Sequence, residues 1–204
     1  MPKTSVGILI FDDVEVLDFA GPFEVFSRAR TIPGADSRRT EDSAPFVVFT
    51  VGRSTAAVTA TGGLSVAPRY SFANVPRIDL LVVPGGFGTR ALLKDDKVLD
   101  WIRRTAVNLR QLTSVCTGSL LLAQAGLLRG RRATTHWAAL DTLAGIDAGL
   151  QVDREKRVVD DGGVITSAGV ASGIDMAFYI VERMCGKAVA DDTAKYMEYR
   201  RVSS

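Results

Sequence analysis

The chain has 204 residues, of which 47% are hydrophobic and 24% charged, a composition that suits one compact globular domain and excludes a disordered or fibrous chain. Its 25 basic and 23 acidic residues leave a formal net charge of +2 without a basic stripe, so nothing indicates a nucleic-acid partner. The apolar runs are too short for a membrane span and poorly flanked for a signal peptide, so we expect a single cytoplasmic domain over residues 1–204.

The first part of the chain predicts a strand, a loop and a helix, followed by further strands. Residues 4–11 form a short β-branched and aromatic run that ends at acidic turn residues, as a buried strand does. A proline then opens a helical pattern over residues 22–30. We expect a surface loop over 31–43, a strand over 46–51 and a second strand or hairpin around 61–66.

Two similar units follow in the middle of the chain. The apolar run 78–83 predicts a strand that stops at Pro-Gly-Gly, and a helical pattern covers residues 96–107. Residues 112–115 predict another short strand. The run 118–128 is apolar nearly all round, as a fully buried helix would be.

The last part of the chain continues the alternation of strands and helices. We expect a strand within 131–135, a helix over 137–143, two strands around an Asp-Gly-Gly turn within 158–169, and terminal helices over 173–184 and 191–200. Strands that alternate with helices predict a mostly parallel sheet covered on both faces, which is a three-layer α/β sandwich.

Ligands in such folds bind at the carboxyl ends of the strands. Three predicted loops meet this criterion, because they follow the strands that end at Phe11, Val83 and Val115. Candidate functional residues are therefore expected in these loops.

Cys116 is the strongest candidate for chemistry. It stands between a buried strand and a Gly-containing helix start, which is the position of a nucleophile elbow whose sharp turn exposes the side chain. We expect the positive end of the following helix to lower the pKa of the thiol and to favour the reactive thiolate. The alternative is an inert buried cysteine, but the position favours the functional interpretation.

Backbone amides near the elbow are candidates for stabilising negative charge. The amide of Thr117 is expected to point to where charge develops after attack, with Gly86 as a second donor. Gly85 and Gly86 belong to the run Pro-Gly-Gly-Phe-Gly, whose glycines let amides approach a substrate. The alternative is a tight strand-to-helix turn, and the run lacks the dinucleotide pattern G-x-G-x-x-G.

Asp18 is a candidate acid or base. It lies between Leu17 and Phe19 just beyond the first strand, where loss of hydration disfavours the charged carboxylate. A partly buried carboxyl can exchange protons with a reacting group. The alternative is that Asp18 caps the helix that follows, and the residues themselves leave both interpretations open.

His136 and Cys185 are weaker candidates. His136 is the one histidine of the chain, so a Cys–His pair with Cys116 has to be considered, but nothing near it in the sequence establishes such a pair. Cys185 precedes a glycine at a helix end and indicates ordinary packing. One histidine and two distant cysteines make no recognisable metal site, so we expect no metal.

Four motifs together resemble the ThiJ/PfpI superfamily, which has the flavodoxin-like, class I glutamine amidotransferase-like fold. They are LDFAGPFEVF, VVPGGFG, SVCTGSLLLAQAGLL and RATTHW, and the match extends over most of the chain. The last two motifs are similar above all to isocyanide (isonitrile) hydratases and to the amidase-like sensor domains of AraC-type regulators.

The resemblance to the hydratases implies a cofactor-independent reaction that adds water to an isocyanide and gives an N-substituted formamide. It implies that Cys116 is the nucleophile and that Asp18 interacts with it as a general acid/base. PfpI-type proteases carry histidine directly after the cysteine, where this chain has Thr117, so proteolysis is not expected. The superfamily usually forms dimers, so a homodimer that acts on a small molecule is expected.

A sensing function is the alternative that the resemblance leaves open. The related regulators continue into a helix-turn-helix region, whereas this sequence stops at Ser204, so we expect no DNA-binding part. The domain would then bind a small molecule, or its thiol would respond to oxidants, because reactive cysteines oxidise readily. Turnover of a substrate distinguishes an enzyme from a sensor.

Overall fold

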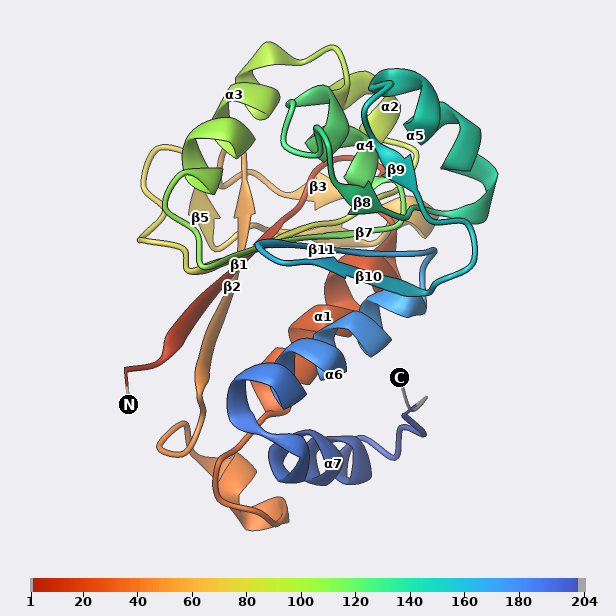
Figure 1. The fold of residues 1–204 in the computed structure, drawn as a ribbon. Helices are drawn as coiled ribbons and strands as arrows, with labels where there is room; N and C mark the ends of the chain where they lie inside the picture. The colour runs from red at the N-terminus through yellow and green to blue at the C-terminus, as the bar shows by residue number, and fades with distance from the viewer. Residues whose placement is uncertain (1, 202–204) are drawn as a thin grey trace.

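The structure is a computed structural model that describes residues 2–201. Its centre is a sheet of seven strands (Figure 1). The strand order is β10-β11-β7-β6-β1-β2-β5, and every neighbouring pair is parallel except β10 with β11. The strands are β1 (Thr4–Leu9), β2 (Phe46–Gly52), β5 (Tyr70–Ser71), β6 (Leu80–Val83), β7 (Gln111–Val115), β10 (Val158–Asp161) and β11 (Val164–Ser167). The expected mostly parallel sheet is confirmed.

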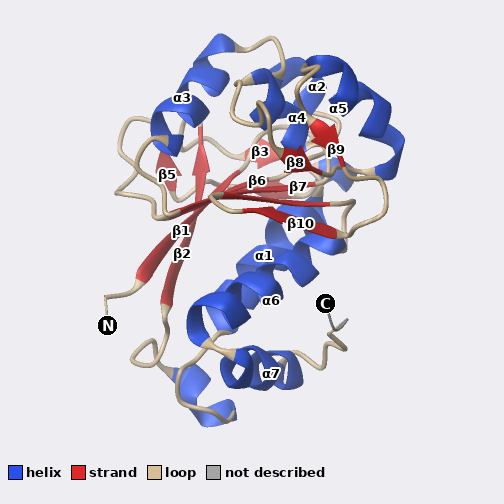
Figure 2. Cartoon of the chain, in the orientation of Figure 1, coloured by secondary structure: helices blue, strands red, loops and turns tan. Residues whose placement is uncertain are grey.

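Helices cover both faces of this sheet, which confirms the predicted three-layer α/β architecture (Figure 2). In Figure 1, α1, α6 and α7 lie on one face and α2 to α5 on the other. The helices are α1 (Val16–Arg28), α2 (Thr89–Leu92), α3 (Asp96–Ala106), α4 (Gly118–Gln124), α5 (Leu140–Ile146), α6 (Ser172–Cys185) and α7 (Lys187–Tyr196). Every residue of β6 and β7 is buried, as expected for parallel strands enclosed by helices.

Two small sheets lie outside the central one. β3 (Val58–Thr59) and β4 (Ser65–Val66) pair in antiparallel fashion, so the hairpin expected around residues 61–66 is confirmed. β8 (Arg132–Ala133) pairs in parallel with β9 (Gln151–Val152). After β8 the chain returns to the edge of the central sheet at which Cys116 lies. The Thr135 hydroxyl there donates a hydrogen bond to the Cys116 carbonyl.

The first helix is longer than the sequence pattern predicts. α1 begins at Val16, six residues before Pro22, so the proline lies inside the helix instead of opening it. A proline there removes one backbone hydrogen bond, and packing of the helix compensates. Gly21 lies so close to α6 that an added Cβ would be 2.8 Å from Ile174 Cγ1. The close contact of α1 with α6 therefore keeps the helix continuous across Pro22.

The helix after Cys116 is shorter than expected. α4 ends at Gln124, whereas the apolar pattern continues to Leu128. Gly126 has a φ of 77°, in the left-handed region that ends helices. The apolar run beyond it is still buried, with Leu128 fully enclosed, so periodicity alone overestimated the helix.

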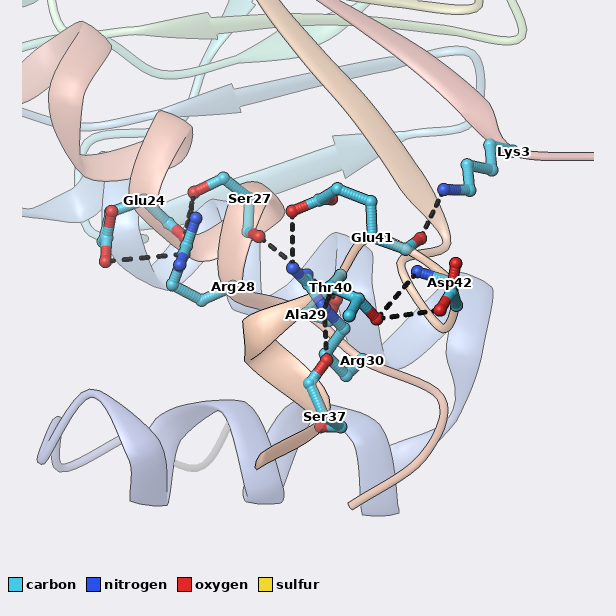
Figure 3. A network of polar contacts seen from close by, with 10 residues as sticks. All are labelled: Lys3, Glu24, Ser27, Arg28, Ala29, Arg30, Ser37, Thr40, Glu41 and Asp42. Atoms are coloured by element: carbon cyan, nitrogen blue, oxygen red, sulfur yellow. Dashed lines mark hydrogen bonds and ion pairs between the residues drawn. The ribbon is translucent and has the colours of Figure 1, made fainter. Parts of the chain in front are cut away.

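The loop between α1 and β2 is organised around a buried arginine (Figure 3). Arg30 is 1% exposed, and its guanidinium donates to carbonyl oxygens of Ser27 and Ala29 at the end of α1. It also donates to the carbonyls of Ser37 and Thr40 and to the Glu41 carboxylate across the loop. The expected surface loop thus encloses a charged group that binds its two ends together.

The topology places the loops after β1, β6 and β7 beside one another. These strands are neighbours in the sheet and parallel, so their carboxyl ends share one edge. β2 lies on one side of β1, and β6 and β7 lie on the other, so the order in which strands are added reverses at β1. Ligands in open α/β sheets bind at such a reversal point. Among residues 2–201, no helix combines the length and the hydropathy needed to cross a bilayer.

Candidate active site

Asp18, Gly85, Gly86, Cys116 and Thr117 come together at this edge of the sheet. Asp18 belongs to the first turn of α1, the two glycines follow β6, and Cys116 and Thr117 join β7 to α4. The Gly85 amide donates to Asp18 Oδ2 at 2.8 Å. The five residues singled out from the sequence are therefore spatial neighbours.

Cys116 occupies the sharp turn expected of an elbow. Its φ is 54°, in the left-handed region that non-glycine residues seldom adopt. The Cys116 amide donates to the carbonyls of Ser167 and Ala168, and its carbonyl accepts from the hydroxyls of Thr135 and Ser119. These contacts from the end of β11, the segment after β8 and the first turn of α4 hold the backbone in its strained conformation.

Gly118 lets the helix start close against the sheet. A Cβ at this position would lie 2.0 Å from the Val83 carbonyl oxygen, which no side chain can tolerate. The glycine after the elbow is thus required for close approach between the start of α4 and the end of β6. That approach brings Thr117 against the Gly85–Gly86 turn.

Asp18 is a fully buried carboxyl group with a raised pKa. Its exposure is 0%, and Oδ1 has no hydrogen-bond partner. Burial raises the pKa of Asp18 from 3.8 to about 7, because the carboxylate loses its hydration, and the negative charge of Glu15 adds to this. The hydrogen bond from Gly85 and contact with Cys116 act in the opposite direction.

The interpretation of Asp18 as a helix cap is wrong. The residue that precedes α1 is Glu15, and Asp18 lies within the first turn with its side chain directed to Gly85 instead of to the helix amides. The remaining interpretation is that Asp18 is a buried carboxyl group beside the Cys116 thiol. The pKa of Asp18, about 7, suits an acid or a base.

The predicted fall in the pKa of the thiol is also wrong. Burial raises the pKa of Cys116 from 9.0 to about 12, and the negative charge of Asp18 acts in the same direction. Hydrogen bonds from the amides of Thr117 and Val170 and from the Thr117 hydroxyl oppose the rise without cancelling it. The resting site therefore holds a thiol, and Asp18 is the adjacent group that can accept its proton.

The amides of Gly85 and Gly86 already have partners within the protein. Gly85 donates to Asp18, and Gly86 donates to the Thr117 hydroxyl at 3.1 Å. The Thr89 hydroxyl lies 3.2 Å from the same Thr117 oxygen and donates to the Gly86 carbonyl. The Thr117 amide is directed at the Cys116 sulfur, where its hydrogen bond lowers the pKa of the thiol. Roles of these amides towards a substrate stay predictions.

A pocket of about 250 Å³ opens onto Cys116. Its walls come from all the loops at this edge and comprise Glu15, Gly86, Phe87, Arg90, Cys116, Thr117, His136, Ala138 and Val170. Phe87 is 67% exposed, so the mouth carries a large aromatic surface. The pocket can admit a small molecule to the thiol.

His136 lines this pocket without pairing with the thiol. Its Nδ1 accepts a hydrogen bond from the Ala138 amide at 3.2 Å, which makes it the cap of the short turn that follows. Its ring also packs against Gly169, where a Cβ would lie 2.3 Å from His136 Cδ2. Cys185 is half-buried at the end of α6. Within residues 2–201, no cluster of three or more His, Cys, Asp or Glu side chains could hold a metal.

Sequence reasoning missed Val170, whose amide is directed at the Cys116 sulfur. Val170 has a φ of 40° and lies in the loop after β11, which is parallel to β7 and so ends at the same edge. The feature of the sequence that could have indicated Val170 is a fourth strand, β11, that is followed by small residues. Glu15, Phe87 and Arg90 had no such signal, because their places in the pocket depend on how two loops meet.

The model of the DJ-1/PfpI family matches residues 4–183. The chain belongs to the DJ-1/PfpI family. This agrees with the resemblance to the ThiJ/PfpI superfamily that the sequence motifs carry. The relatives of this chain include both an enzyme and a transcriptional regulator.

The isonitrile hydratase of Pseudomonas putida is 37% identical to this chain over 195 residues, which are 96% of the chain and 78% of that protein. The HTH-type transcriptional regulator GbdR of Pseudomonas aeruginosa is 27% identical over 199 residues, which are 97% of the chain and 51% of the regulator. The chain thus spans about half of the regulator's length.

Solved structures agree with the family assignment. A ThiJ/PfpI family protein from Pseudomonas syringae superimposes with a TM-score of 0.86 at 31% identity, covering 100% of this chain and 78% of the other. Drosophila melanogaster DJ-1beta gives a TM-score of 0.82 at 23% identity, covering 98% and 100%. The second likeness concerns the fold alone.

Proposed function

We propose that this protein hydrates an isocyanide to an N-substituted formamide, with Cys116 as nucleophile and Asp18 as general acid/base. The observation that carries the proposal is the pair itself, a buried carboxyl with a pKa of about 7 beside an elbow thiol that a small pocket reaches. The similarity to an isonitrile hydratase over 96% of the chain supports the choice of substrate.

The first half of the reaction forms a thioimidate. Asp18 as carboxylate takes the Cys116 thiol proton while the sulfur forms a bond to the terminal carbon of the isocyanide. Asp18 then delivers this proton to the same carbon, so R–N≡C becomes R–N=CH–S–Cys116. The proton moves from sulfur to carboxylate to carbon, and no cofactor takes part.

The second half releases the product. Water adds to the thioimidate carbon, and Asp18 accepts one of its protons and delivers it to the nitrogen, which gives R–NH–CH(OH)–S–Cys116. Breakage of the carbon–sulfur bond returns the electron pair to the sulfur, which takes the proton of the hydroxyl group through Asp18, and R–NH–CHO leaves. The Thr117 and Val170 amides stabilise negative charge on the sulfur as it forms and leaves.

The test is formamide formation from a simple alkyl isocyanide by the purified protein. We expect turnover by the natural chain and loss of at least about a hundredfold in Cys116→Ala and in Asp18→Asn, since positioned acid/base groups contribute about 10²–10⁴-fold. Matched controls are Cys185→Ala, which removes the other thiol, and Asp13→Asn, which removes an exposed carboxyl of the turn before α1. Both controls should keep the activity.

Absence of formamide from the natural chain under these conditions would contradict the hydratase proposal. Equal activity in Cys116→Ala would retain hydration but contradict covalent catalysis. A gel-filtration profile of the active protein tests the expected homodimer in the same experiment.

A small-molecule sensing domain is the second candidate, because a transcriptional regulator matches over 97% of the chain. This candidate predicts reversible binding of a ligand in the Cys116 pocket without turnover. Oxidant sensing at Cys116 predicts that dilute peroxide modifies it in preference to Cys185. The raised pKa of the buried thiol disfavours this last alternative.

A further inference from the structure

The mouth of the Cys116 pocket carries a cation whose hydrogen-bonding edge is free. Arg90 lines the pocket, and its guanidinium lies over the ring of Phe87 at 4.9 Å from the ring centroid. Stacking uses the flat face of the guanidinium and leaves its N–H groups at the edge available. Among the described residues, no carboxylate lies within ion-pair distance of Arg90, whereas Arg53, Arg157 and Arg183 are paired.

The other charges at the pocket do not cancel that of Arg90. Asp18 has a pKa of about 7 and is largely uncharged in slightly acid solution. Glu15 is the one carboxylate among the residues that line the pocket, and it precedes α1 directly, where the positive end of a 13-residue helix offsets part of its charge. A ligand that reaches Cys116 therefore passes the positive charge of Arg90 beside the ring of Phe87.

We propose that Arg90 selects, at this pocket, substrates whose substituent ends in a carboxylate. The isocyanide carbon lies against Cys116, the body of the substituent lies along Phe87, and the carboxylate accepts hydrogen bonds from the guanidinium edge. The volume of about 250 Å³ limits the substituent to a small one. The assignment deepens the proposed function and rests on it for the reaction.

The first test compares isocyanoacetate with its methyl ester, which have the same reacting group and differ in charge. We expect kcat/KM to favour isocyanoacetate at low salt, and this preference to fall about tenfold in Arg90→Gln, with the ester unaffected. The matched control is Arg104→Gln, which changes an exposed arginine whose Nε donates to the Asp100 carbonyl away from the pocket. Salt at about 0.5 M should reduce the preference as well.

The second test does not require isocyanide turnover. Iodoacetate and iodoacetamide both alkylate a thiol, and the first carries a carboxylate where the second carries an amide. In a Cys185→Ala background, the ratio of their rate constants at Cys116 should fall about tenfold in Arg90→Gln and stay constant in Arg104→Gln.

The outcomes separate the two proposals. Turnover of neither isocyanide would contradict the hydratase function, and the alkylation ratio then decides by itself whether Arg90 recruits carboxylates. An alkylation ratio that is equal in the natural chain and Arg90→Gln would overturn the selection by Arg90, whether or not isocyanides are hydrated.

Discussion

Asp18 lies where a charged carboxylate is unfavourable, and the protein retains it next to a thiol. The side chain has 0% exposure, one oxygen bonds the Gly85 amide and the other has no partner. A protonated carboxyl is easier to bury than an anion, which is why its pKa rises to about 7. The same burial that makes Asp18 useful for proton transfer makes it a source of instability at alkaline pH.

The stability of the protein should therefore fall with pH in a way that depends on Asp18. The folded-state pKa of about 7 lies above the ordinary 3.8, so the native state holds a proton that the unfolded chain releases. As pH rises from about 4 to 7, the release of this proton on unfolding lowers the free energy of unfolding by up to about 1.4 kcal/mol per pH unit. Asp18→Asn removes that contribution, and urea unfolding at several pH values measures it.

The comparison with Asp13→Asn isolates this effect from other titrating groups. We expect Asp18→Asn to gain stability relative to the natural chain as pH rises from 5 to 8, while Asp13→Asn stays parallel to it. A stability difference between Asp18→Asn and the natural chain that does not change with pH would show that Asp18 titrates normally.

At the scale of elements, Arg30 holds the end of α1 and the loop before β2 in one arrangement (Figure 3). Its donors bond four carbonyl oxygens and the Glu41 carboxylate, and the side chain has no exposed surface. A buried arginine whose three side-chain nitrogens all donate hydrogen bonds is costly to truncate, because carbonyl acceptors lose their partners in a place that water does not reach.

We expect Arg30→Met to lower the free energy of unfolding by roughly 3 kcal/mol or more. Arg39→Met is the matched control, because its side chain is 82% exposed and its ion pair with Asp36 is at the surface. Thermal or urea unfolding measures both. Below the transition, alkylation of Cys116 should proceed equally in the two variants, and a loss confined to Arg39→Met would contradict this account.

The sequence alone predicted the elements whose patterns are local. Strand periodicity and turn residues located β1, β6 and β7, and the cysteine two residues before Gly118 indicated the sharp turn at which Cys116 has a φ of 54°. The start of α1 was missed because contact with α6 overrides the effect of Pro22. The pKa of Cys116 was predicted in the wrong direction because burial and the neighbouring carboxyl depend on tertiary packing, which outweighs the helix end.

The whole molecule gathers its candidate site at one edge of the sheet, where the strand order reverses. β1, β6, β7 and β11 end there, and they supply Asp18, Gly85, Cys116 and Val170. The chain is similar in sequence to a hydratase and to a regulator, so its family does not decide between catalysis and sensing. That decision belongs to the carboxyl–thiol pair and to the pocket that reaches it.

Covalent catalysis by Cys116 is tested by mass spectrometry of the protein quenched in acid during reaction with an isocyanide. We expect the peptide containing Cys116 to gain the full mass of the isocyanide, as a thioimidate, and Cys116→Ser to gain nothing. Cys185→Ala should show the same adduct as the natural chain. Formamide production without any adduct at Cys116, or by Cys116→Ala at the natural rate, would contradict it.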